Sequence, residues 1–398
     1  MRKLLFLLLA ASTWSACTKT ELTPTSSVQS SEETDATTTN KSITLTKGSD
    51  SGLYLNGDNF SYSPGDTLVL TGSWSYCTLE NVYGTSSKNI VIINKGGKVK
   101  MTSGFSFTNC RYIQVLGNGA SGVYYGFSIA ATTNSGVGVT IQGRSSDIEV
   151  ARVDIYNKTY GYWVKEEASC IDSLEYPNWV INNIQIRRGR IRVCNQEGMY
   201  LGSTDPNGTR AITCSGETIY PKPLRLGFIR VHHMKIDSTY RSGIQLSAAS
   251  GQTSQIHDNT VTNCGYEYNS DGQGCGISLG GYTTAKVYNN TIKNTYTMGI
   301  SSLGAGQIII QNNKVTNSGT LSGHTVSGMA NIMVDTRYTS PVDSTTFNVS
   351  GNTLSGTTDY NIRVYKTYST YTKKNIIYNN NSGNATKSVA SGVTWSTQ

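Results

Sequence analysis

This chain of 398 residues is poor in charge, in proline and in long apolar runs. Charged residues make up 15% and hydrophobic residues 37%, against roughly 25% and 45–50% in an ordinary globular domain. A coiled coil and a bundle of transmembrane helices are therefore excluded. Residues that form helices weakly are abundant, Gly among them with 41 copies, which excludes a mostly helical fold. Short apolar runs persist to the C-terminus, so the chain is not disordered.

The patterns of nucleic-acid-binding and nucleotide-binding proteins are missing as well. The formal net charge is only +8, and no basic run is interleaved with aromatic residues, so we expect no nucleic-acid partner. There is no nucleotide-binding glycine loop, and we expect no nucleotide. The absence of a Cys-x-x-Cys motif argues against structural zinc and thioredoxin chemistry.

The N-terminus has the order of an export signal. A basic start at Arg2 and Lys3 leads into an apolar run, and small residues precede Cys17. The run is shorter than the roughly 20 apolar residues that span a bilayer, which predicts a cleaved signal peptide. The segment resembles a bacterial lipoprotein signal, which implies that residues 1–16 are removed and that Cys17 is acylated. Trp14 stands where Leu is usual, and a plain secretory signal is the alternative.

The segment after the signal is a predicted tether. Residues 17–42 are rich in Thr and Ser and contain few aliphatic residues, a composition typical of flexible linkers. The folded body is then residues 43–398. We expect an exported protein, lipid-anchored through Cys17 to the bacterial outer membrane or cell surface.

One phrase recurs through the second half of the chain. An apolar residue, two variable positions, Asn, a polar residue and a second apolar residue occur at 256–261, 287–292, 310–315 and 349–354. A Gly-Ile-x-Leu phrase or a close variant follows each copy; Ile300, for example, lies ten residues after Asn290. The steps between successive Asn positions vary instead, at 31, 23 and 39 residues. The spacing between the two phrases within a repeat (the inner spacing) is constant, and the spacing between successive repeats varies. This indicates strands of fixed length joined by loops of variable length.

The repeat predicts an all-β fold, a single-stranded right-handed parallel β-helix (a solenoid) with capped ends. Each phrase alternates with a period of two, as a half-buried strand does, and one coil buries its apolar residues only by stacking on others. Asn259, Asn290, Asn313 and Asn352 are expected to form side-chain ladders and to occupy left-handed corners. Residues 43–60 and the tail after Asn380 are expected to cover the ends. A β-sandwich is the alternative, but it would not explain the fixed inner spacing.

With these phrases the mature chain resembles the secreted bacterial proteins with right-handed β-helix repeats. That superfamily includes polysaccharide lyases, some glycoside hydrolases, uronate epimerases and members without known activity. The resemblance implies an extended polysaccharide as the partner, lying along a strand face flanked by loops. It does not choose a reaction, because a fold does not fix a function.

The outward positions of the Gly-Ile-x-Leu strand are the candidate binding surface. In the first four copies they are Trp163, Tyr200, Gln245 and Ser278. Charged residues beside the same strands are Lys165, Glu166, Glu167, Glu197 and Arg241. Coils stack about 4.8 Å apart, so we expect these side chains to converge within the width of one sugar ring. The two largest insertions, 166–181 and 203–224, follow the first two of these strands.

Two reactions fit these residue types. In β-elimination from a uronate, Lys165 and Arg241 would neutralise the carboxylate and Tyr200 would remove the C5 proton. In hydrolysis, Glu197 would pair with Glu166 or Glu167 across the scissile bond.

The remaining residues of the candidate surface would contact the sugar. The predicted substrate-binding residues are Trp163, Glu166, Glu167, Gln245 and Ser278, with Trp163 and Tyr200 offering a flat platform to a sugar face. The alternative to an enzyme is a non-catalytic glycan-binding or adhesive module on the same face, which needs only aromatics and amides.

Three further features rank lower. Cys170 and Cys214 fall in the two insertions and form a candidate disulfide, while the other cysteines of the body are expected to be buried thiols. The adjacent His232 and His233 alternate along a strand, so one is expected to point inward and a shared metal is not expected. A loop at Asp271 offers oxygen ligands that would suit Ca2+, the one cofactor we consider, although its carboxylates are sparse.

Overall fold

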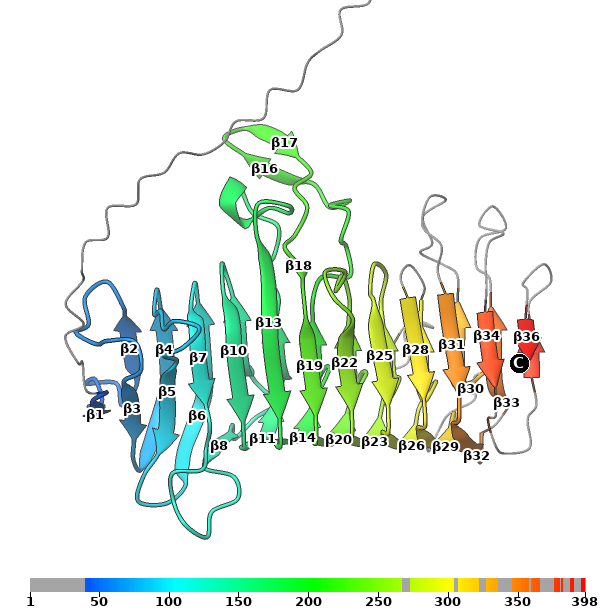
Figure 1. The fold of residues 1–398 in the computed structure, drawn as a ribbon, viewed down its shortest axis with the longest axis horizontal. Helices are drawn as coiled ribbons and strands as arrows, with labels where there is room; N and C mark the ends of the chain where they lie inside the picture. Colours follow the sequence, from blue (N-terminus) through cyan, green and yellow to red (C-terminus); the bar gives the residue numbers. More distant parts are fainter. Residues whose placement is uncertain are drawn as a thin grey trace, which may run out of the picture. The chain divides into compact units, whose positions relative to one another are not determined.

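The computed structural model describes residues 40–266, 273–303, 307–321, 327–335, 346–357, 359–365, 376–379, 381, 387–389 and 395–397. These residues wind into coils that follow one another in sequence order (Figure 1). Each full coil contributes one strand to each of three parallel rows, named here sheet A, row B1 and row B2. Every pairing within the rows is parallel, as between Ile191 and Ile236 of neighbouring coils.

Sheet A consists of β1 (Ser42–Thr44), β3 (Thr67–Leu70), β5 (Ile90–Asn94), β7 (Arg111–Val115), β10 (Ser146–Ala151), β13 (Val180–Arg187), β19 (Ile229–His232), β22 (Ser254–His257), β25 (Ala285–Tyr288), β28 (Gln307–Gln311), β31 (Thr346–Ser350), β34 (Ile376–Asn379) and β36 (Trp395–Thr397). Row B1 consists of β8 (Phe127–Ala130), β11 (Val153–Lys158), β14 (Arg190–Cys194), β20 (Lys235–Thr239), β23 (Thr260–Cys264), β26 (Thr291–Thr295), β29 (Lys314–Ser318) and β32 (Thr353–Ser355).

Row B2 consists of β2 (Leu53–Asn56), β9 (Val137–Gln142), β12 (Tyr160–Val164), β15 (Met199–Leu201), β21 (Ile244–Leu246), β24 (Ile277–Leu279), β27 (Ile300–Ser302), β30 (Ala330–Asp335), β33 (Tyr360–Tyr365) and β35 (Lys387–Val389). The long strands β4 (Ser73–Glu80) and β6 (Val99–Thr108) run through both rows, since the first part of β6 pairs with β8 and its second part with β9. This is the all-β, single-stranded parallel β-helix predicted from the repeat.

The core is a set of apolar columns that run through the coils. In row B1 the inward position is occupied by Ile155, Ile191, Ile236, Val261, Ile292, Val315 and Leu354 in register, all at most 1% exposed. Full burial of such a side chain contributes roughly 1.5–3 kcal/mol. Because each coil covers the apolar faces of its neighbours, the alternating phrases in the sequence are sufficient to explain the fold.

The predicted asparagine ladder is present and buried. Asn259 donates from both its backbone N and its Nδ2 to Oδ1 of Asn290, at 3.1 and 2.9 Å. Asn290 binds Asn313 in the same way, at 3.0 and 2.9 Å, and Asn313 binds Asn352 at 2.9 Å twice.

The left-handed corner, however, lies one residue earlier than we expected. Positive φ angles of 54–55° belong to Asp258, Asn289 and Asn312, the residues that precede the ladder positions. The ladder asparagines Asn259, Asn290 and Asn313 do not have a positive φ, and their side-chain amides point toward the next coil. The expectation that the same asparagine fills both roles was wrong.

The end segments continue the coils. In the segment 43–60, β1 pairs with β3 and β2 with β4. Beyond Asn380, β35 pairs with β33 and β36 with β34. These segments therefore cover the ends as additional short coils that extend the sheets.

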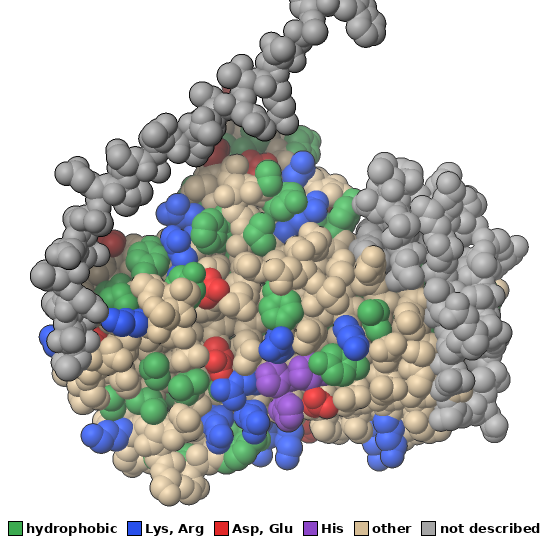
Figure 2. Space-filling view, in the orientation of Figure 1, with side chains coloured by type: hydrophobic (Ala, Val, Ile, Leu, Met, Phe, Trp, Pro, Cys, Tyr) green, Lys and Arg blue, Asp and Glu red, His purple; other side chains and the backbone are tan. Residues whose placement is uncertain are grey.

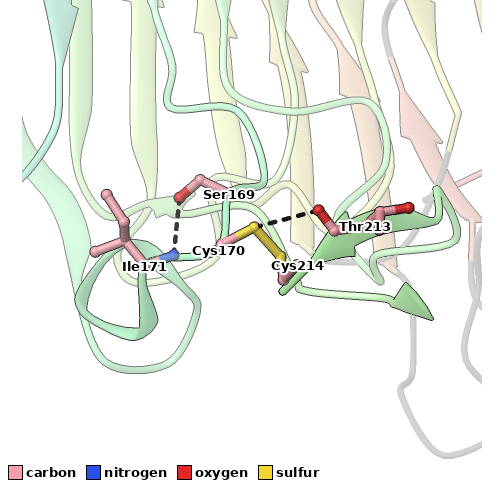
Figure 3. Close-up of a disulfide and its surroundings, with 5 residues drawn as sticks. All are labelled: Ser169, Cys170, Ile171, Thr213 and Cys214. Atoms are coloured by element: carbon pink, nitrogen blue, oxygen red, sulfur yellow. Dashed lines mark hydrogen bonds between the residues drawn. A yellow bond between two sulfur atoms is a disulfide. The ribbon is translucent and has the colours of Figure 1, made fainter. Parts of the chain in front are cut away.

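Two insertions separate row B2 from sheet A in consecutive coils. The first leaves β12 at Val164 and includes the 3-10 helix η1 (Asp172–Leu174); the second leaves β15 at Leu201 and contains the antiparallel pair β16 (Ile212–Cys214) and β17 (Glu217–Ile219). It returns through β18 (Arg225–Leu226), which pairs with β13. The predicted Cys170–Cys214 disulfide joins the two insertions (Figure 3).

The other described cysteines, Cys77, Cys110, Cys194, Cys264 and Cys275, are buried thiols, as expected. Burial raises the pKa of the Cys194 and Cys264 thiols to about 12, so they stay protonated and unreactive. In the part of the chain that the structure describes, no helix is long and apolar enough to cross a membrane.

Candidate functional site

Row B2 aligns the predicted outward residues as the sequence repeat requires. Trp163 of β12 pairs with Tyr200 of β15, Tyr200 with Gln245 of β21, and Gln245 with Ser278 of β24. Residues separated by 37 and 45 positions in the sequence are thus direct neighbours. The register of the candidate surface is confirmed.

The aromatic rings do not form a flat platform. The rings of Trp163 and Tyr200 stack on one another, with centroids 5.0 Å apart and planes 16° apart. Residues at one register position in adjacent coils are separated by about 4.8 Å, which is a stacking distance, so each ring turns a face to the other. Tyr160, at the start of β12, meets both rings at steep angles of 69° and 67°.

A lysine lies against this aromatic pair. Lys165 Nζ is 5.0 Å from the centre of the Trp163 ring and 4.8 Å from that of Tyr200. It forms an ion pair of 2.6 Å with Glu167 Oε1. The two partners differ in exposure, because the lysine side chain is 7% exposed and the glutamate 54%. We call Tyr160, Trp163, Lys165, Glu167 and Tyr200 the Lys165 cluster.

A second pair of charges borders this cluster. Arg241 Nη1 lies 4.0 Å from Glu197 Oε1, and the glutamate side chain is only 1% exposed. Both charges act on Tyr160: burial raises the pKa of its hydroxyl, Glu197 raises it further, and Arg241 opposes them. A raised pKa makes Tyr160 a poor base at neutral pH.

Tyr160 was not among the residues predicted for the site, although the sequence contained an indication that it lies there. It opens the same strand as Trp163, in the stretch Tyr160-Gly161-Tyr162-Trp163. Strict alternation would place Tyr160 and Tyr162 on one face, yet Tyr162 is fully buried while Tyr160 is half-buried.

The other predicted residues lie outside the cluster. Glu166 Oε2 accepts a hydrogen bond of 2.7 Å from the Gly143 backbone N, on the preceding coil. Burial raises the pKa of Glu166, and the Gly143 amide partly offsets this. Gln245 and Ser278 are 4% and 2% exposed, so they are not part of an open groove. The accessible part of the surface is therefore confined to the coils of β12 and β15.

The second insertion starts at the cluster. The Tyr200 hydroxyl lies 3.1 Å from Thr204 Oγ1. The next residue, Asp205, accepts hydrogen bonds of 2.8–3.0 Å from Thr209 and Arg210, which order the loop. Burial acts to raise the pKa of Asp205, but these bonds and the Lys165 charge outweigh it and the pKa is lowered. Loop and cluster are thus coupled through contacts and charge.

The expectation that one of the paired histidines points inward was wrong. His232 ends β19, and His233 has a positive φ of 55°, which breaks the alternation and brings Nδ1 of the two rings to 2.8 Å. His257 stacks on His232 with centroids 4.9 Å apart. Figure 2 shows the histidines together on the outer face of sheet A, beside Lys and Arg side chains.

A metal ligand set is not found in the described ranges. Among these residues no group of three or more His, Cys, Asp or Glu is placed to hold a metal ion. The Asp271 loop that we considered for Ca2+ lies outside the described residues.

Comparisons with known proteins assign no family to this chain. No family model and no curated protein matches this chain. Among solved structures, an alginate lyase from Paenibacillus sp. str. FPU-7 is similar over 90% of this chain and 98% of its own, with 12% identity and a TM-score of 0.39. The periplasmic alginate epimerase AlgG is similar over 89% and 84%, with 12% identity and a TM-score of 0.40.

A mannuronic acid specific polysaccharide family 6 lyase from human gut microbiota is similar over 88% of this chain and 82% of its own, with 13% identity and a TM-score of 0.36. At this level of similarity we transfer neither a reaction nor a residue role to this chain. Its function has to be argued from its own side chains.

Proposed function

We propose that this protein binds a uronate-containing polysaccharide at the Lys165 cluster. The observation that supports this is the position of Lys165, a cation held against two aromatic rings and paired with an exposed carboxylate. A uronate offers the same two complementary parts, a carboxylate and a ring with apolar C–H groups. Glu167 would then occupy, in the free protein, the place that the sugar carboxylate takes in the complex.

The exchange of carboxylates is energetically feasible. Displacing Glu167 exchanges one carboxylate for another, so the buried Lys165 charge is not left without a counter-charge, and the exposed Glu167 returns to water. Lys165 is already buried and oriented, and less side-chain entropy is lost when the sugar binds. Partial desolvation strengthens the ion pair of Lys165 with either carboxylate, so it does not oppose the exchange.

Titration calorimetry with oligomannuronate and oligogalacturonate tests the proposal. We expect Lys165→Met, which keeps the length of the side chain, to weaken binding at least 10-fold. Glu167→Gln removes the internal competitor and should tighten binding about 2–5-fold, the equivalent of a weak ion pair. Glu217→Gln is the matched control, since it removes one negative charge from exposed β17 in the second insertion and should leave affinity unchanged.

Two results would contradict the proposal. One is binding of a uronate oligomer that Lys165→Met leaves intact. The other is an equal change of affinity in Glu167→Gln and Glu217→Gln. That would show that Glu167 acts only through the net charge of the protein and does not compete with the ligand for Lys165.

β-Elimination at the same cluster is the second candidate. It is favoured by the Tyr200 hydroxyl, which shares the cluster with the cation that would neutralise the uronate carboxylate. Tyr200, as its phenolate, would take the C5 proton, and the C4–C5 double bond would form as the bond from C4 to the glycosidic oxygen breaks. That oxygen would then receive the proton from the Tyr200 hydroxyl. Hydrolysis has less support, because Glu197 is buried and Glu166 faces the Gly143 amide.

The ultraviolet absorbance of the unsaturated product separates an enzyme from a binding module. An eliminating enzyme should release this product and lose it in Tyr200→Phe, while the affinity changes little. Product that survives in Lys165→Ala, Glu197→Ala and Arg241→Ala would place the reaction elsewhere.

For the N-terminus we propose the organisation expected from the sequence. Residues 1–16 would be a lipoprotein signal peptide, Cys17 the acylated residue and 17–42 a tether, with export to the outer membrane or cell surface. Residues 1–39 lie outside the described part of the chain, so this proposal is supported by the sequence pattern alone.

A further inference from the structure

The outer face of sheet A carries a pocket that the Lys165 cluster does not use. It has a volume of about 260 Å³, slightly below the range of about 300–1,000 Å³ for sites of drug-sized ligands. The polar residues that line it are Ser86, Asn89, Tyr112, Gln114, Asp147, Glu149, Asn183 and Gln185. They come from β7, β10, β13 and the turn before β5, whereas the Lys165 cluster is carried by β12 and β15 and the segment after β12.

Three of the lining residues share an uncommon backbone conformation. Tyr112, Asp147 and Asn183 occupy corresponding places in β7, β10 and β13, and their φ angles are 57°, 56° and 53°. None of the three has a register partner in the pairing of β7 with β10 or of β10 with β13, although the residues on either side of it are paired. A side chain with positive φ is costly and persists only where the surroundings hold it. Here the same left-handed position recurs in three coils with the register unchanged, and it lines one pocket.

Hydrogen bonds fix some of the lining groups and leave others available. Asn183 Nδ2 donates to Asp147 Oδ1 at 2.7 Å, and Gln114 Nε2 donates to Glu149 Oε2 at 3.1 Å. Glu149 is also ion-paired with Arg187. Gln185, next to Glu149 in the parallel register, has no side-chain hydrogen bond to another described residue. Its amide can therefore both donate to and accept from a ligand.

The chemistry of this lining identifies the ligand class. The pocket lining presents carboxylates, amides and hydroxyls but no Lys or Arg. The neighbouring Arg187 is already paired with Glu149, so an anionic ligand would meet the Asp147 carboxylate and a guanidinium whose charge is already balanced. A divalent cation is disfavoured, because the lining offers only two carboxylates and one of them, Glu149, is already paired with Arg187. A planar carboxylate or amide can form hydrogen bonds with two neighbouring hydroxyl groups of a sugar, because each hydroxyl both donates and accepts.

We propose that the sheet A pocket binds a neutral, hydroxyl-rich sugar unit of a glycan. Asp147 and Glu149 accept hydrogen bonds from its hydroxyls, and Gln185 and Asn89 donate and accept at its edges. The site differs from the Lys165 cluster in both place and charge preference, so it does not depend on the function proposed above.

Titration calorimetry with mannohexaose, cellohexaose and xylohexaose tests this inference on the whole protein. We expect at least one of the three to bind, and Gln185→Ala to weaken its binding at least 5-fold. Gln255→Ala is the matched control, because Gln255 lies two coils further along the same outward column, after Arg230, and is not part of the pocket lining. Both substitutions truncate a glutamine on a strand surface, and circular dichroism should show an unchanged fold.

The outcomes separate the two sites. Lys165→Met should leave binding of the neutral oligosaccharide unchanged, and Gln185→Ala should leave binding of oligomannuronate unchanged. The inference is overturned if none of the three oligosaccharides binds, if Gln255→Ala weakens binding as much as Gln185→Ala, or if the pocket binds Ca2+ in place of a sugar.

Discussion

At the scale of single residues, the asparagines show how a repeated side chain organises the coils. Asn290 accepts from the backbone N and Nδ2 of Asn259 and donates to Ile256 O and to Asn313 Oδ1. The ladder therefore satisfies buried backbone groups on two neighbouring coils. Periodicity was enough to predict it, because equal spacing from the strands places the amides one above the other.

Removing one ladder amide should destabilise the protein well beyond an ordinary surface change. Asn290→Ala leaves the buried Asn259 N–H and the Ile256 carbonyl without their partner, at about 1–3 kcal/mol for each group. We expect the free energy of unfolding in denaturant to fall by about 2–5 kcal/mol. The exposed neighbour Thr291→Ala serves as the control and should change it by less than about 0.5 kcal/mol. Equal effects of the two substitutions would contradict the structural role of the ladder.

At the scale of elements, the insertions after β12 and β15 adjoin the candidate site. The disulfide between Cys170 and Cys214 ties them together, and the sequence allowed this pairing because both insertions follow adjacent strands of row B2. The orientation of the aromatic rings could not be predicted in the same way. It depends on the distance between coils and on the side-chain rotamers, which make Trp163 and Tyr200 stack on each other.

Breaking this cross-link should loosen the insertions without unwinding the coils. The bond joins residues 44 positions apart, for which loop-closure entropy gives a contribution of up to about 4 kcal/mol. In Cys170→Ser/Cys214→Ser we expect new protease cleavage within 203–224 and an unchanged β signal in circular dichroism. Ser169→Ala, beside the same bond (Figure 3), is the control. A cleavage pattern equal to that of the native protein would show that the insertions are ordered without the disulfide.

At the scale of the whole molecule, the sequence repeat was sufficient for the fold but not for the site. Inward columns such as Ile236, Val261 and Ile292 follow directly from the alternating phrases. The burial of Gln245 and Ser278 could not be predicted. A two-residue period shows which side chains point inward and which outward, but it does not show whether an outward side chain is covered by other residues. The sheet A pocket was missed for a related reason: the left-handed backbone at Tyr112, Asp147 and Asn183 departs from the extended conformation that a two-residue period assumes.

The stacking of coils is the claim on which the candidate sites depend, and engineered disulfides test it most directly. Thr262 of β23 and Lys293 of β26 are register partners on the outer face of row B1, within the Cα separation of about 4.4–6.8 Å that a disulfide needs. Thr316 of β29 is the partner of Lys293, so it lies two coils from Thr262 and beyond that reach.

Under mild oxidation, Thr262→Cys/Lys293→Cys should gain one intramolecular disulfide, seen by mass spectrometry of non-reduced peptides, and Thr262→Cys/Thr316→Cys should not. Cross-linking of the first pair alone is the result that the β-helix predicts. Failure of the first pair, or equal cross-linking of both pairs, would contradict the coil register and remove the basis of both proposed sites.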